Sequence, residues 1–220
     1  MKKTKDICEE FVAKLKAEEF VIDKTGVKTI EIMNACFLAD DEALFGTVNQ
    51  DYIKRELAWY LSTSRYVDDI PAPVPEIWKK VASKEGKINS NYGWCIYSID
   101  NGSQFKQCVA ELKNNPDSRR AVMIYTRPWM HEDYNKDGMS DFICTNTVQY
   151  LIRDGKVHAL VYMRSNDAVF GYKNDYAWQL YVLYSVAAEV GMPVGDIYWN
   201  VASLHIYERH FKLVEDYDKA

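Results

Sequence analysis

The order of helix-like and strand-like segments is the feature that most narrows the folds open to this chain of 220 residues. In the C-terminal half, apolar spacing predicts two strands in succession, then a long helix and a further long strand. Because helices and strands mix without strict alternation, the pattern predicts an α+β fold in which helices are layered on a sheet. The predicted strands cover residues 28–38, 121–126, 142–152, 157–165 and 196–207, and the predicted helices cover residues 4–19, 48–62, 76–83, 103–114, 175–190 and 208–217.

Composition indicates the size of the folded unit. Apolar residue types make up 48% of the chain and aromatic types 14%, which is enough to fill a large interior. The richest proline stretch, residues 71–75, is too short to separate two domains, and the chain shows no internal repeat. A single domain over residues 1–220 is therefore expected.

The charge balance narrows the classes of partner. Acidic residues outnumber basic ones by 32 to 27, and this net charge of −5 disfavours a non-specific nucleic-acid binder and a binder of anionic membranes. No apolar run approaches the roughly 18 residues that a membrane span needs. The N-terminal residues turn acidic at Glu9 and Glu10 without an apolar signal core. These features predict a cytoplasmic protein that needs neither a membrane nor a nucleic acid.

Cysteine and histidine spacing does not favour a metal site. The five cysteines are scattered without a Cys-x-x-Cys pair, and the four histidines never occur as His-Glu-x-x-His. Residues 133–138 begin like a calcium-binding loop, but Cys144 stands at the twelfth position, where such loops carry a bidentate glutamate. We therefore expect reduced thiols, a polar turn at residues 133–138 and no bound metal.

Two clusters of polar residues lie in the strand-rich part of the sequence. Arg119 and Arg120 follow a turn, where tandem arginines are either solvated surface charge or a pair that binds a phosphate dianion. Residues 164–167 (Arg-Ser-Asn-Asp) close a predicted strand, and Asp175 starts the next predicted helix. This arrangement is typical of an ordinary turn with Asp175 as the helix N-cap, and it also suits a binding site at a strand end.

Two further residues have side chains suited to catalysis. A lone cysteine in a predicted strand, such as Cys144, is commonly a small buried residue, but nearby arginines would favour its nucleophilic thiolate. Glu56 shares a helical stripe with Tyr52 and Tyr60. Its carboxylate is therefore either partly desolvated and able to transfer protons, or paired with a basic residue at the surface.

Seven segments, in their order and spacing, resemble the thymidylate synthase superfamily along nearly the whole chain. They are residues 23–29, 55–57, 91–93, 116–120, 144–149, 164–167 and 203–207. Within the superfamily the likeness is closest to the phage enzymes that hydroxymethylate deoxycytidylate (dCMP). The resemblance implies a mixed sheet layered with helices and a homodimer that forms through the sheet. A phage enzyme of this kind would work in the cytoplasm of the bacterial host.

The resemblance also implies a reaction. The family thiolate, here Cys144, adds to ring carbon 6 of a pyrimidine, and carbon 5 then takes the one-carbon unit of the co-substrate 5,10-methylenetetrahydrofolate. Glu56 matches the family glutamate that manages protons and ordered water around the base. Tyr92 matches a tyrosine near carbon 5 that assists proton removal.

The remaining matches are residues that bind the two substrates. Phosphate-binding positions are matched by Lys24, Arg164 and Ser165 and, from the partner subunit, by Arg119 and Arg120. Lys24 replaces an arginine of thymidylate synthases. Other nucleotide-binding positions are matched by Asn166, His205 and Tyr207, the last two at the deoxyribose hydroxyl, and folate-side positions are matched by Trp78, Asp167 and Gly171.

Departures from the thymidylate synthase pattern indicate the substrate and the product. Asp175 replaces an asparagine, and an ionised carboxylate only accepts hydrogen bonds, which suits the amino group of cytosine better than a carbonyl of uracil. The same carboxylate can share a proton with the cytosine ring nitrogen. Thr145 replaces a histidine after the nucleophile. The chain also ends at Ala220, without the extension that closes the thymidylate synthase site, and an open site favours addition of water over transfer of hydride.

Two alternatives stay open on the sequence. A dUMP methylase or hydroxymethylase of the same superfamily would use the same thiol but conflicts with Asp175. A non-catalytic relative that binds a nucleotide or RNA would not need Cys144, Glu56 and the arginine set. The sequence therefore favours an enzyme that forms 5-hydroxymethyl-dCMP from dCMP, with Asp175 selecting the base.

Overall fold

A mixed sheet organises the fold. The computed structural model describes residues 1–219, and Ala220, on which the expectation of a missing closing segment depends, lies outside the described residues. The strands follow the order β1-β3-β8-β6-β5-β4, while β2 pairs with β3 and β7 pairs with β8. Their bounds are β1 (Lys2–Lys3), β2 (Val21–Ile22), β3 (Lys28–Leu38), β4 (Val122–Ile124), β5 (Thr145–Arg153), β6 (Lys156–Met163), β7 (Asn166–Asp167) and β8 (Val194–Tyr207).

Local sequence explains how the central strands are connected. β5 and β6 form an antiparallel hairpin through Asp154 and Gly155, whose φ angles of 51° and 71° suit a two-residue turn. β6 and β8 run parallel, which requires a long crossover. Helix α7 (Gly171–Val190) supplies that crossover and ends at Gly191, which has a left-handed φ of 72°.

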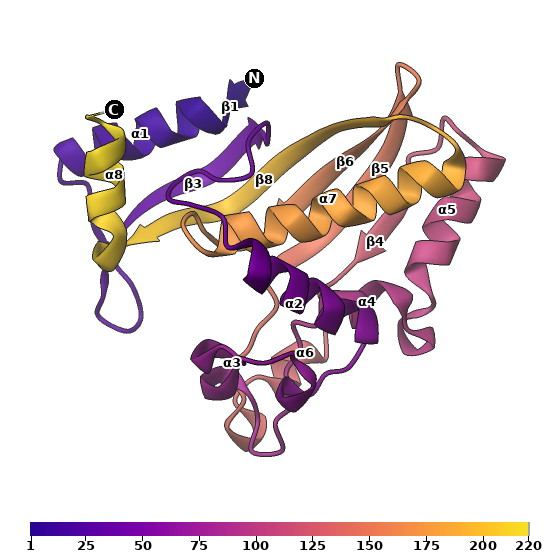
Figure 1. Cartoon of the computed structure of the whole chain (residues 1–220), viewed down its shortest axis with the longest axis horizontal. Helices are drawn as coiled ribbons and strands as arrows, with labels where there is room; N and C mark the ends of the chain where they lie inside the picture. The colour runs from indigo at the N-terminus through magenta and orange to yellow at the C-terminus, as the bar shows by residue number, and fades with distance from the viewer. Residues whose placement is uncertain (220) are drawn as a thin grey trace.

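Helices cover one side of the sheet. Figure 1 shows α7 lying along the strands, with α2 and α4 beside it and α5 near β4. The predicted α+β fold with helices layered on a mixed sheet is therefore confirmed. The other helices are α1 (Thr4–Lys16), α2 (Gln50–Ser62), α3 (Glu76–Val81), α4 (Tyr92–Tyr97), α5 (Gln104–Asn114), α6 (Met130–Asp133) and α8 (Phe211–Tyr217).

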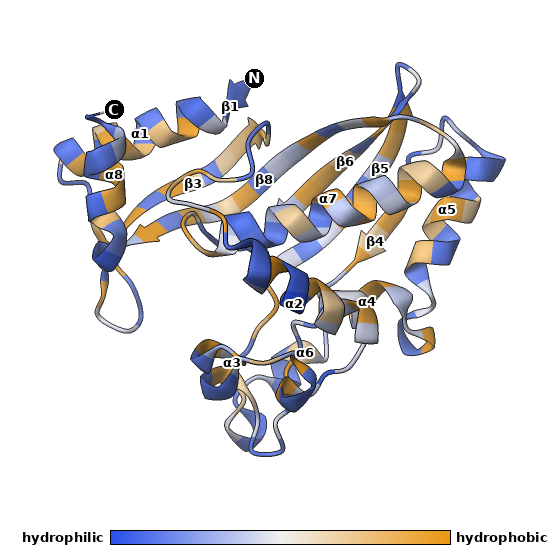
Figure 2. Cartoon of the chain, viewed as in Figure 1, coloured by the Kyte–Doolittle hydropathy of each residue, from blue (hydrophilic) through white to orange (hydrophobic). Residues whose placement is uncertain are grey.

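The core is rich in aromatic side chains. Its largest fully buried side chains include Trp59, Trp178, Trp199, Tyr125 and Tyr150. Figure 2 shows apolar residues along the central strands, and the buried residues of α7 include Trp178, Val182 and Leu183. The large aromatic interior expected from composition is thus present, between the sheet and the helices that cover it.

Two expectations about element boundaries are wrong. The helix predicted to start at Asp175 starts at Gly171, so Asp175 lies inside α7 and is not its N-cap. Asp167 leads the chain into this helix instead, because its Oδ1 accepts hydrogen bonds from the backbone N–H groups of Val169 (2.7 Å) and Phe170 (3.1 Å). β5 starts at Thr145, so the preceding cysteine lies just before the strand and not within it.

The short elements α4, α6, β1, β2 and β7 have no counterpart among the predicted segments. Each is six residues long or shorter, so apolar periodicity has too few residues to reveal it. Within residues 1–219, no helix has the length and apolar character needed to cross a membrane.

Candidate active site

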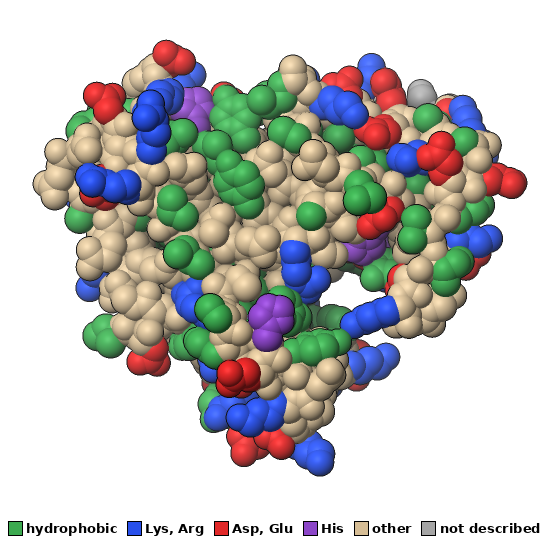
Figure 3. Space-filling view, turned by 180° about the vertical axis from the view of Figure 1, so that it is seen from behind, with side chains coloured by type: hydrophobic (Ala, Val, Ile, Leu, Met, Phe, Trp, Pro, Cys, Tyr) green, Lys and Arg blue, Asp and Glu red, His purple; other side chains and the backbone are tan. Residues whose placement is uncertain are grey.

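A cleft of about 1060 Å³ brings together segments that are far apart in the sequence. Figure 3 shows a hollow on the face opposite that of Figure 1, with basic side chains and a histidine beside it. Residues that line the cleft and were predicted for the site are Lys24, Cys144, Arg164, Ser165, Asp167, His205 and Tyr207. Three others, Glu56, Tyr92 and Asn166, are buried.

Cys144 lies on the cleft wall, and Arg164 holds the segment that carries it. Arg164 Nη2 lies 3.7 Å from Cys144 Sγ, and the same guanidinium donates to the backbone oxygens of Phe142 (2.6 Å) and Ile143 (2.9 Å). Burial raises the pKa of the Cys144 thiol to about 12, although the charge of Arg164 lowers it. The arginine expected beside the thiol is therefore present, but its effect is smaller than that of burial, and the free thiol is neutral at pH 7.

Helix α2 buries Glu56, which is only 5% exposed, behind Tyr52, a residue that lines the cleft. The Tyr52 hydroxyl donates to Glu56 Oε1 at 2.6 Å, and Trp78 Nε1 donates to the Tyr52 hydroxyl at 3.0 Å. Burial raises the pKa of Glu56 to about 7, while hydrogen bonds from Tyr52 and Tyr60 lower it. The predicted stripe of Tyr52, Glu56 and Tyr60 is confirmed, and Glu56 populates both protonation states near neutral pH.

Helix α7 brings Asp175 into the same region. Asn166 Nδ2 donates to Asp175 Oδ2 at 2.8 Å, while Asn166 Oδ1 accepts from Trp199 Nε1 at 3.3 Å. Burial, followed by the charge of Glu56, raises the pKa of Asp175 to about 8, and hydrogen bonds from Tyr92 and Asn166 oppose this shift. At pH 7 the acid is mainly neutral, so it both donates and accepts hydrogen bonds. This raised pKa suits the expectation that the group shares a proton with a ring nitrogen of cytosine.

The short strand β7 joins the two sides of the cleft. Its residue Asp167 pairs in register with His205 of β8, and the rings of His205 and Tyr207 have centroids 5.0 Å apart. A Cβ on Gly171 would lie 3.0 Å from Asn166 Nδ2. Glycine at this position therefore leaves room for the hydrogen bond from Asn166 to the acid on α7.

Lys24 lies in the turn after β2. Its Nζ donates to the Tyr134 hydroxyl at 3.0 Å, and both Lys24 and Arg164 line the cleft. These basic side chains, together with the Ser165 hydroxyl, suit an anion such as a phosphate.

Arg119 and Arg120 lie away from this cleft, near the start of β4. Arg120 Nη2 donates to Glu111 Oε1 at 2.9 Å, and the Arg119 backbone oxygen accepts from Gln149 Nε2 at 2.8 Å. Both arginines are exposed. One copy of the chain therefore does not bring them together with the other predicted phosphate-binding residues.

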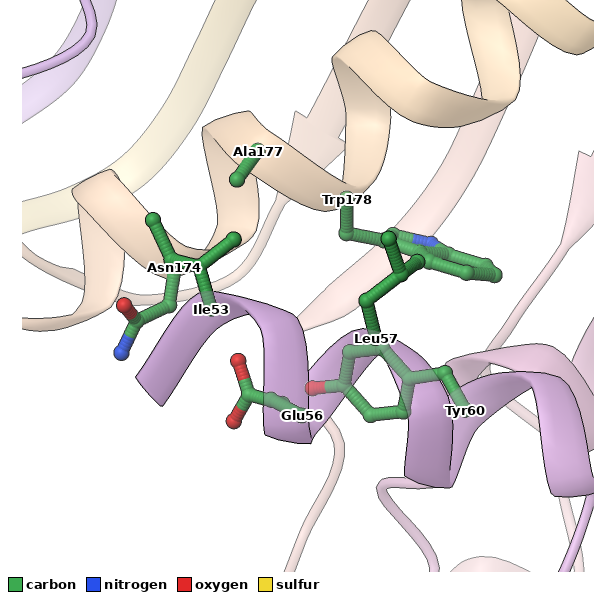
Figure 4. A pocket seen from close by; sticks show the side chains of 7 residues that line it. All are labelled: Ile53, Glu56, Leu57, Tyr60, Asn174, Ala177 and Trp178. Carbon is green, nitrogen blue, oxygen red and sulfur yellow. The ribbon is translucent and has the colours of Figure 1, made fainter. Parts of the chain in front are cut away.

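A small cavity lies between α2 and α7 beside Glu56 (Figure 4). Its volume of about 10 Å³ is close to the space that one water molecule occupies. Its polar lining is Glu56, Tyr60 and Asn174, and Figure 4 shows the Tyr60 hydroxyl directed toward the Glu56 carboxylate. Asn174 also lines the large cleft. Sequence reasoning did not assign it a role, and its place directly before Asp175 is its only signal.

The outer part of the cleft has apolar walls. Ile77 and Phe170 are 58% and 55% exposed, and both line the cleft. Exposed apolar side chains beside polar groups suit a flat aromatic ligand, so these walls fit the ring systems of a folate. Trp78 follows one of these residues, and Gly171 follows the other. Among residues 1–219, no group of three or more potential ligands is arranged to hold a metal ion.

Comparisons with known proteins identify the family of the chain. The family model described as thymidylate synthase matches residues 5–217. Over 212 residues, the chain is 60% identical to the deoxycytidylate 5-hydroxymethyltransferase of Enterobacteria phage T6 and 59% identical to that of phage T4, covering 93% of this chain and 86% of each relative. It is 28% identical to the thymidylate synthase of Corynebacterium aurimucosum over 204 residues, which cover 88% of this chain and 74% of that protein.

A solved structure shows the same fold. The structure of the thermostable thymidylate synthase A from Bacillus subtilis matches with a TM-score of 0.70 at 22% identity, covering 94% of this chain and 82% of that chain. The resemblance expected from the seven sequence segments is confirmed. Both the family model and the relatives at about 60% identity cover most of the sequence, and the chain belongs to the thymidylate synthase family.

Proposed function

We propose that this protein is a deoxycytidylate 5-hydroxymethyltransferase, with one catalytic unit over residues 1–220. It converts dCMP, 5,10-methylenetetrahydrofolate and water into 5-hydroxymethyl-dCMP and tetrahydrofolate. The observation that carries the proposal is that Cys144 lies on the wall of the cleft with Arg164 Nη2 3.7 Å from its sulfur, beside the phosphate-binding candidates Lys24 and Ser165. The phage relatives at 59% and 60% identity bear this enzyme name, which supports the same activity here.

Asp175 selects and activates the base. As a neutral acid it donates its O–H to ring nitrogen 3 of cytosine and accepts a hydrogen bond from the cytosine amino group. Ring nitrogen 3 is basic and can take the proton, which makes the ring a better electrophile. Uracil can form two hydrogen bonds with a neutral acid as well, but its carbonyl oxygen is a much weaker base. Asp175 therefore favours cytosine in the reaction step more than in binding.

Cys144 is the nucleophile. Its sulfur forms a bond to ring carbon 6, and the thiol proton passes to the ionised form of Glu56, whose pKa of about 7 lies below that of Asp175. Arg164, 3.7 Å from the sulfur, stabilises negative charge that develops on it. When the product forms, the carbon–sulfur bond breaks and the thiol takes up a proton again.

The nucleotide lies along the polar side of the cleft. Lys24, Arg164 and Ser165 bind its phosphate, and His205 and Tyr207 bind the deoxyribose hydroxyl. Asn166 holds Asp175 in place through the 2.8 Å hydrogen bond. In a homodimer that forms through the sheet, Arg119 of the partner subunit and Arg120 of the partner subunit complete the phosphate site.

The folate lies along the apolar walls. Trp78, Asp167 and Gly171 hold it beside the base, together with Ile77 and Phe170. Bound 5,10-methylenetetrahydrofolate supplies the one-carbon unit. Tyr92 assists removal of the proton from carbon 5.

Water completes the reaction. Glu56 and Asn174 orient the water that adds to the new exocyclic carbon. By this stage Glu56 has passed the thiol proton to a nitrogen of the leaving tetrahydrofolate, so it can take up the proton that the water loses and return it to the departing sulfur. The small cavity beside these two side chains supports this assignment, because it has the volume of one water molecule.

The test is a product analysis. The protein is incubated with 5,10-methylenetetrahydrofolate and either dCMP or dUMP, and the nucleotides are identified by mass spectrometry. We expect a hydroxymethyl product from dCMP and none from a Cys144→Ser control. A methylated dUMP would contradict the assigned base and the water step. No product from either nucleotide would instead favour a non-catalytic nucleotide-binding protein.

A further inference from the structure

A buried polar cluster lies outside the residues assigned to the proposed reaction. Asn89, Ser90, Asn91 and Asp141 are each no more than 7% exposed. Asp141 Oδ2 accepts hydrogen bonds from the backbone N–H groups of Asn89 (2.7 Å) and Ser90 (2.8 Å), and its Oδ1 accepts one from the Ser90 hydroxyl (2.7 Å). These three donors would lose their partner without the carboxylate, because the site is closed to solvent.

The cluster connects the segment that carries Tyr92 to the segment that carries Cys144. Ser90 lies two residues before Tyr92, the first residue of α4, and Asp141 lies three residues before Cys144. Between Asp141 and Cys144, the Arg164 guanidinium donates to the backbone oxygens of Phe142 and Ile143 and so holds the same segment. The carboxylate thus links two reacting side chains that come from distant parts of the sequence.

The side chain of Asn91 holds the segment that leads to Tyr92 in place through two sets of hydrogen bonds. Asn91 Nδ2 donates to the backbone oxygens of Trp59 (2.9 Å) and Ser64 (2.7 Å), at the end of α2. Asn91 Oδ1 accepts from the backbone N–H of Trp94 at 2.7 Å and so caps α4. α4 is therefore attached to α2, and the hydrogen bonds that Asp141 accepts attach the residues before α4 to the segment that carries the thiol.

We propose that Asp141 is a positioning residue, whose carboxylate holds the Tyr92 segment against the Cys144 segment and thereby sets the alignment of the phenol with the thiol. The inference rests on the proposed function, because it takes Cys144 as the nucleophile. A displacement of about 1 Å at reacting groups can lower a rate by about 100-fold, even when its cause is distant.

The charge of Asp141 has a second, opposite effect. It raises the pKa of the Cys144 thiol, although by less than burial and the charge of Asp175 do. Removing the charge therefore makes the thiol easier to ionise while it disturbs the alignment. A loss of turnover together with easier ionisation distinguishes a positioning role from a general loss of structure.

The main test compares Asp141→Asn with Asp137→Asn, which changes an exposed acid four residues earlier in the same segment. In Asp141→Asn, an amide N–H group faces the donors of Asn89 and Ser90 that the carboxylate accepted from. We expect its kcat and its tritium release from carbon 5 of dCMP to fall about 100-fold, while the Kd for dCMP stays within about twofold. Asp137→Asn should leave all three quantities unchanged.

Thiol ionisation is read from the pH profile of alkylation by iodoacetamide, in a Cys36→Ser background because Cys36 is the other accessible cysteine among the described residues. Asp141→Asn should move the profile of Cys144 to lower pH. Ser90→Ala removes one of the three hydrogen bonds and keeps the charge. It should lower kcat about fivefold without moving the alkylation profile.

Specific outcomes would overturn the proposal. A folded Asp141→Asn protein with the wild-type kcat, or with a change confined to KM, would contradict it. If Asp141→Asn does not fold, Ser90→Ala becomes the test. An unchanged kcat in that variant would contradict the proposal. Turnover that survives Cys144→Ser would instead contradict the proposed function, because the reaction would not use this thiol.

Discussion

The carboxyl groups of Asp175 and Glu56 share a buried region, where each is harder to ionise than in water. Their pKa values of about 8 and about 7 leave one group mainly neutral and the other about half ionised at pH 7. In the proposed reaction, a neutral acid at the base and an ionisable acid beside a water-sized cavity suit two different proton transfers. The environment, and not the residue type, separates the two roles.

Replacing Asp175 by asparagine tests its role in base selection. An amide cannot transfer a proton to cytosine, so we expect Asp175→Asn to lower kcat/KM for dCMP by at least about 100-fold and to raise the relative preference for dUMP. Tritium release from carbon 5, measured with both nucleotides, gives the ratio. Asp137→Asn is the matched control, because it makes the same change at an exposed acid that does not line the cleft. Equal ratios in the wild type and in Asp175→Asn would remove Asp175 from base selection.

Replacing the thiol tests covalent catalysis. Cys144→Ser should lower turnover by at least about 1,000-fold, because a hydroxyl is a far weaker nucleophile than a sulfur at this position. Equilibrium dialysis should show dCMP binding within about threefold of the wild type. Cys36→Ser, at an exposed position on β3, should keep full activity. Substantial product formation by Cys144→Ser would mean that another group attacks the base.

At the scale of elements, α2 and α4 touch through their backbones. A Cβ on Gly93 would lie 1.8 Å from the Tyr60 backbone oxygen, so no larger residue fits without moving a helix. α2 carries Glu56 and α4 begins with Tyr92, and this contact therefore fixes the distance between two site residues.

Gly93→Ala should therefore cost about 3 kcal/mol of unfolding free energy, because the overlap is with backbone and not with a flexible side chain. Gly102→Ala is a useful control, since Gly102 has a φ of 75° but open space around it. We expect that control to cost about 1 kcal/mol, from backbone strain alone. Urea unfolding of both variants measures the difference. Equal losses would show that α4 moves aside without strain.

At the scale of the whole molecule, the two buried acids make stability depend on pH. Their pKa values rise from ordinary values of 4.5 and 3.8 to about 7 and about 8, so the folded state binds more protons than the unfolded state between these limits. Stability should therefore fall as the pH rises from about 4 to about 8. A Glu56→Gln/Asp175→Asn protein should lose less Tm between pH 5 and pH 8 than the wild type. Parallel losses would contradict the raised pKa values.

In the proposed homodimer, each active site contains residues from both chains. Large apolar side chains remain exposed on several strands, among them Met33 (78%) on β3, Ile124 (50%) on β4 and Tyr162 (39%) on β6. Covering such side chains favours association. Arg119 and Arg120, which lie away from the cleft of their own chain, would then serve the cleft of the partner.

Mixing two defective proteins tests this arrangement. One carries Cys144→Ser, and the other carries Arg119→Ala with Arg120→Ala. A mixed dimer has one site with both an intact thiol and intact arginines, so random reassociation should restore about a quarter of the wild-type activity. The variants assayed apart provide the control. No recovery, although mass spectrometry shows that mixed dimers form, would contradict donation of the arginines across the interface.

Local pattern was sufficient for the long elements and insufficient for the short ones. The strands β3, β5, β6 and β8 and the helix α7 were predicted because apolar periodicity is a property of neighbouring residues. The helix α4 was not, because it depends on the cap at Asn91 and on the close contact of Gly93 with α2. The start of α7 was placed four residues late, because the turn made by Asp167 was not recognised.

The sequence by itself determined the fold class, the family and the residue types available for chemistry, because these depend on composition, on periodicity and on the order of short segments. Only the tertiary structure decided that Arg164 lies beside Cys144, that Asp141 links two distant segments and that Asp175 is mainly neutral at pH 7. The physical reason is that a distance, a buried hydrogen bond and a pKa depend on the groups that surround a side chain, and folding brings those groups from every part of the chain.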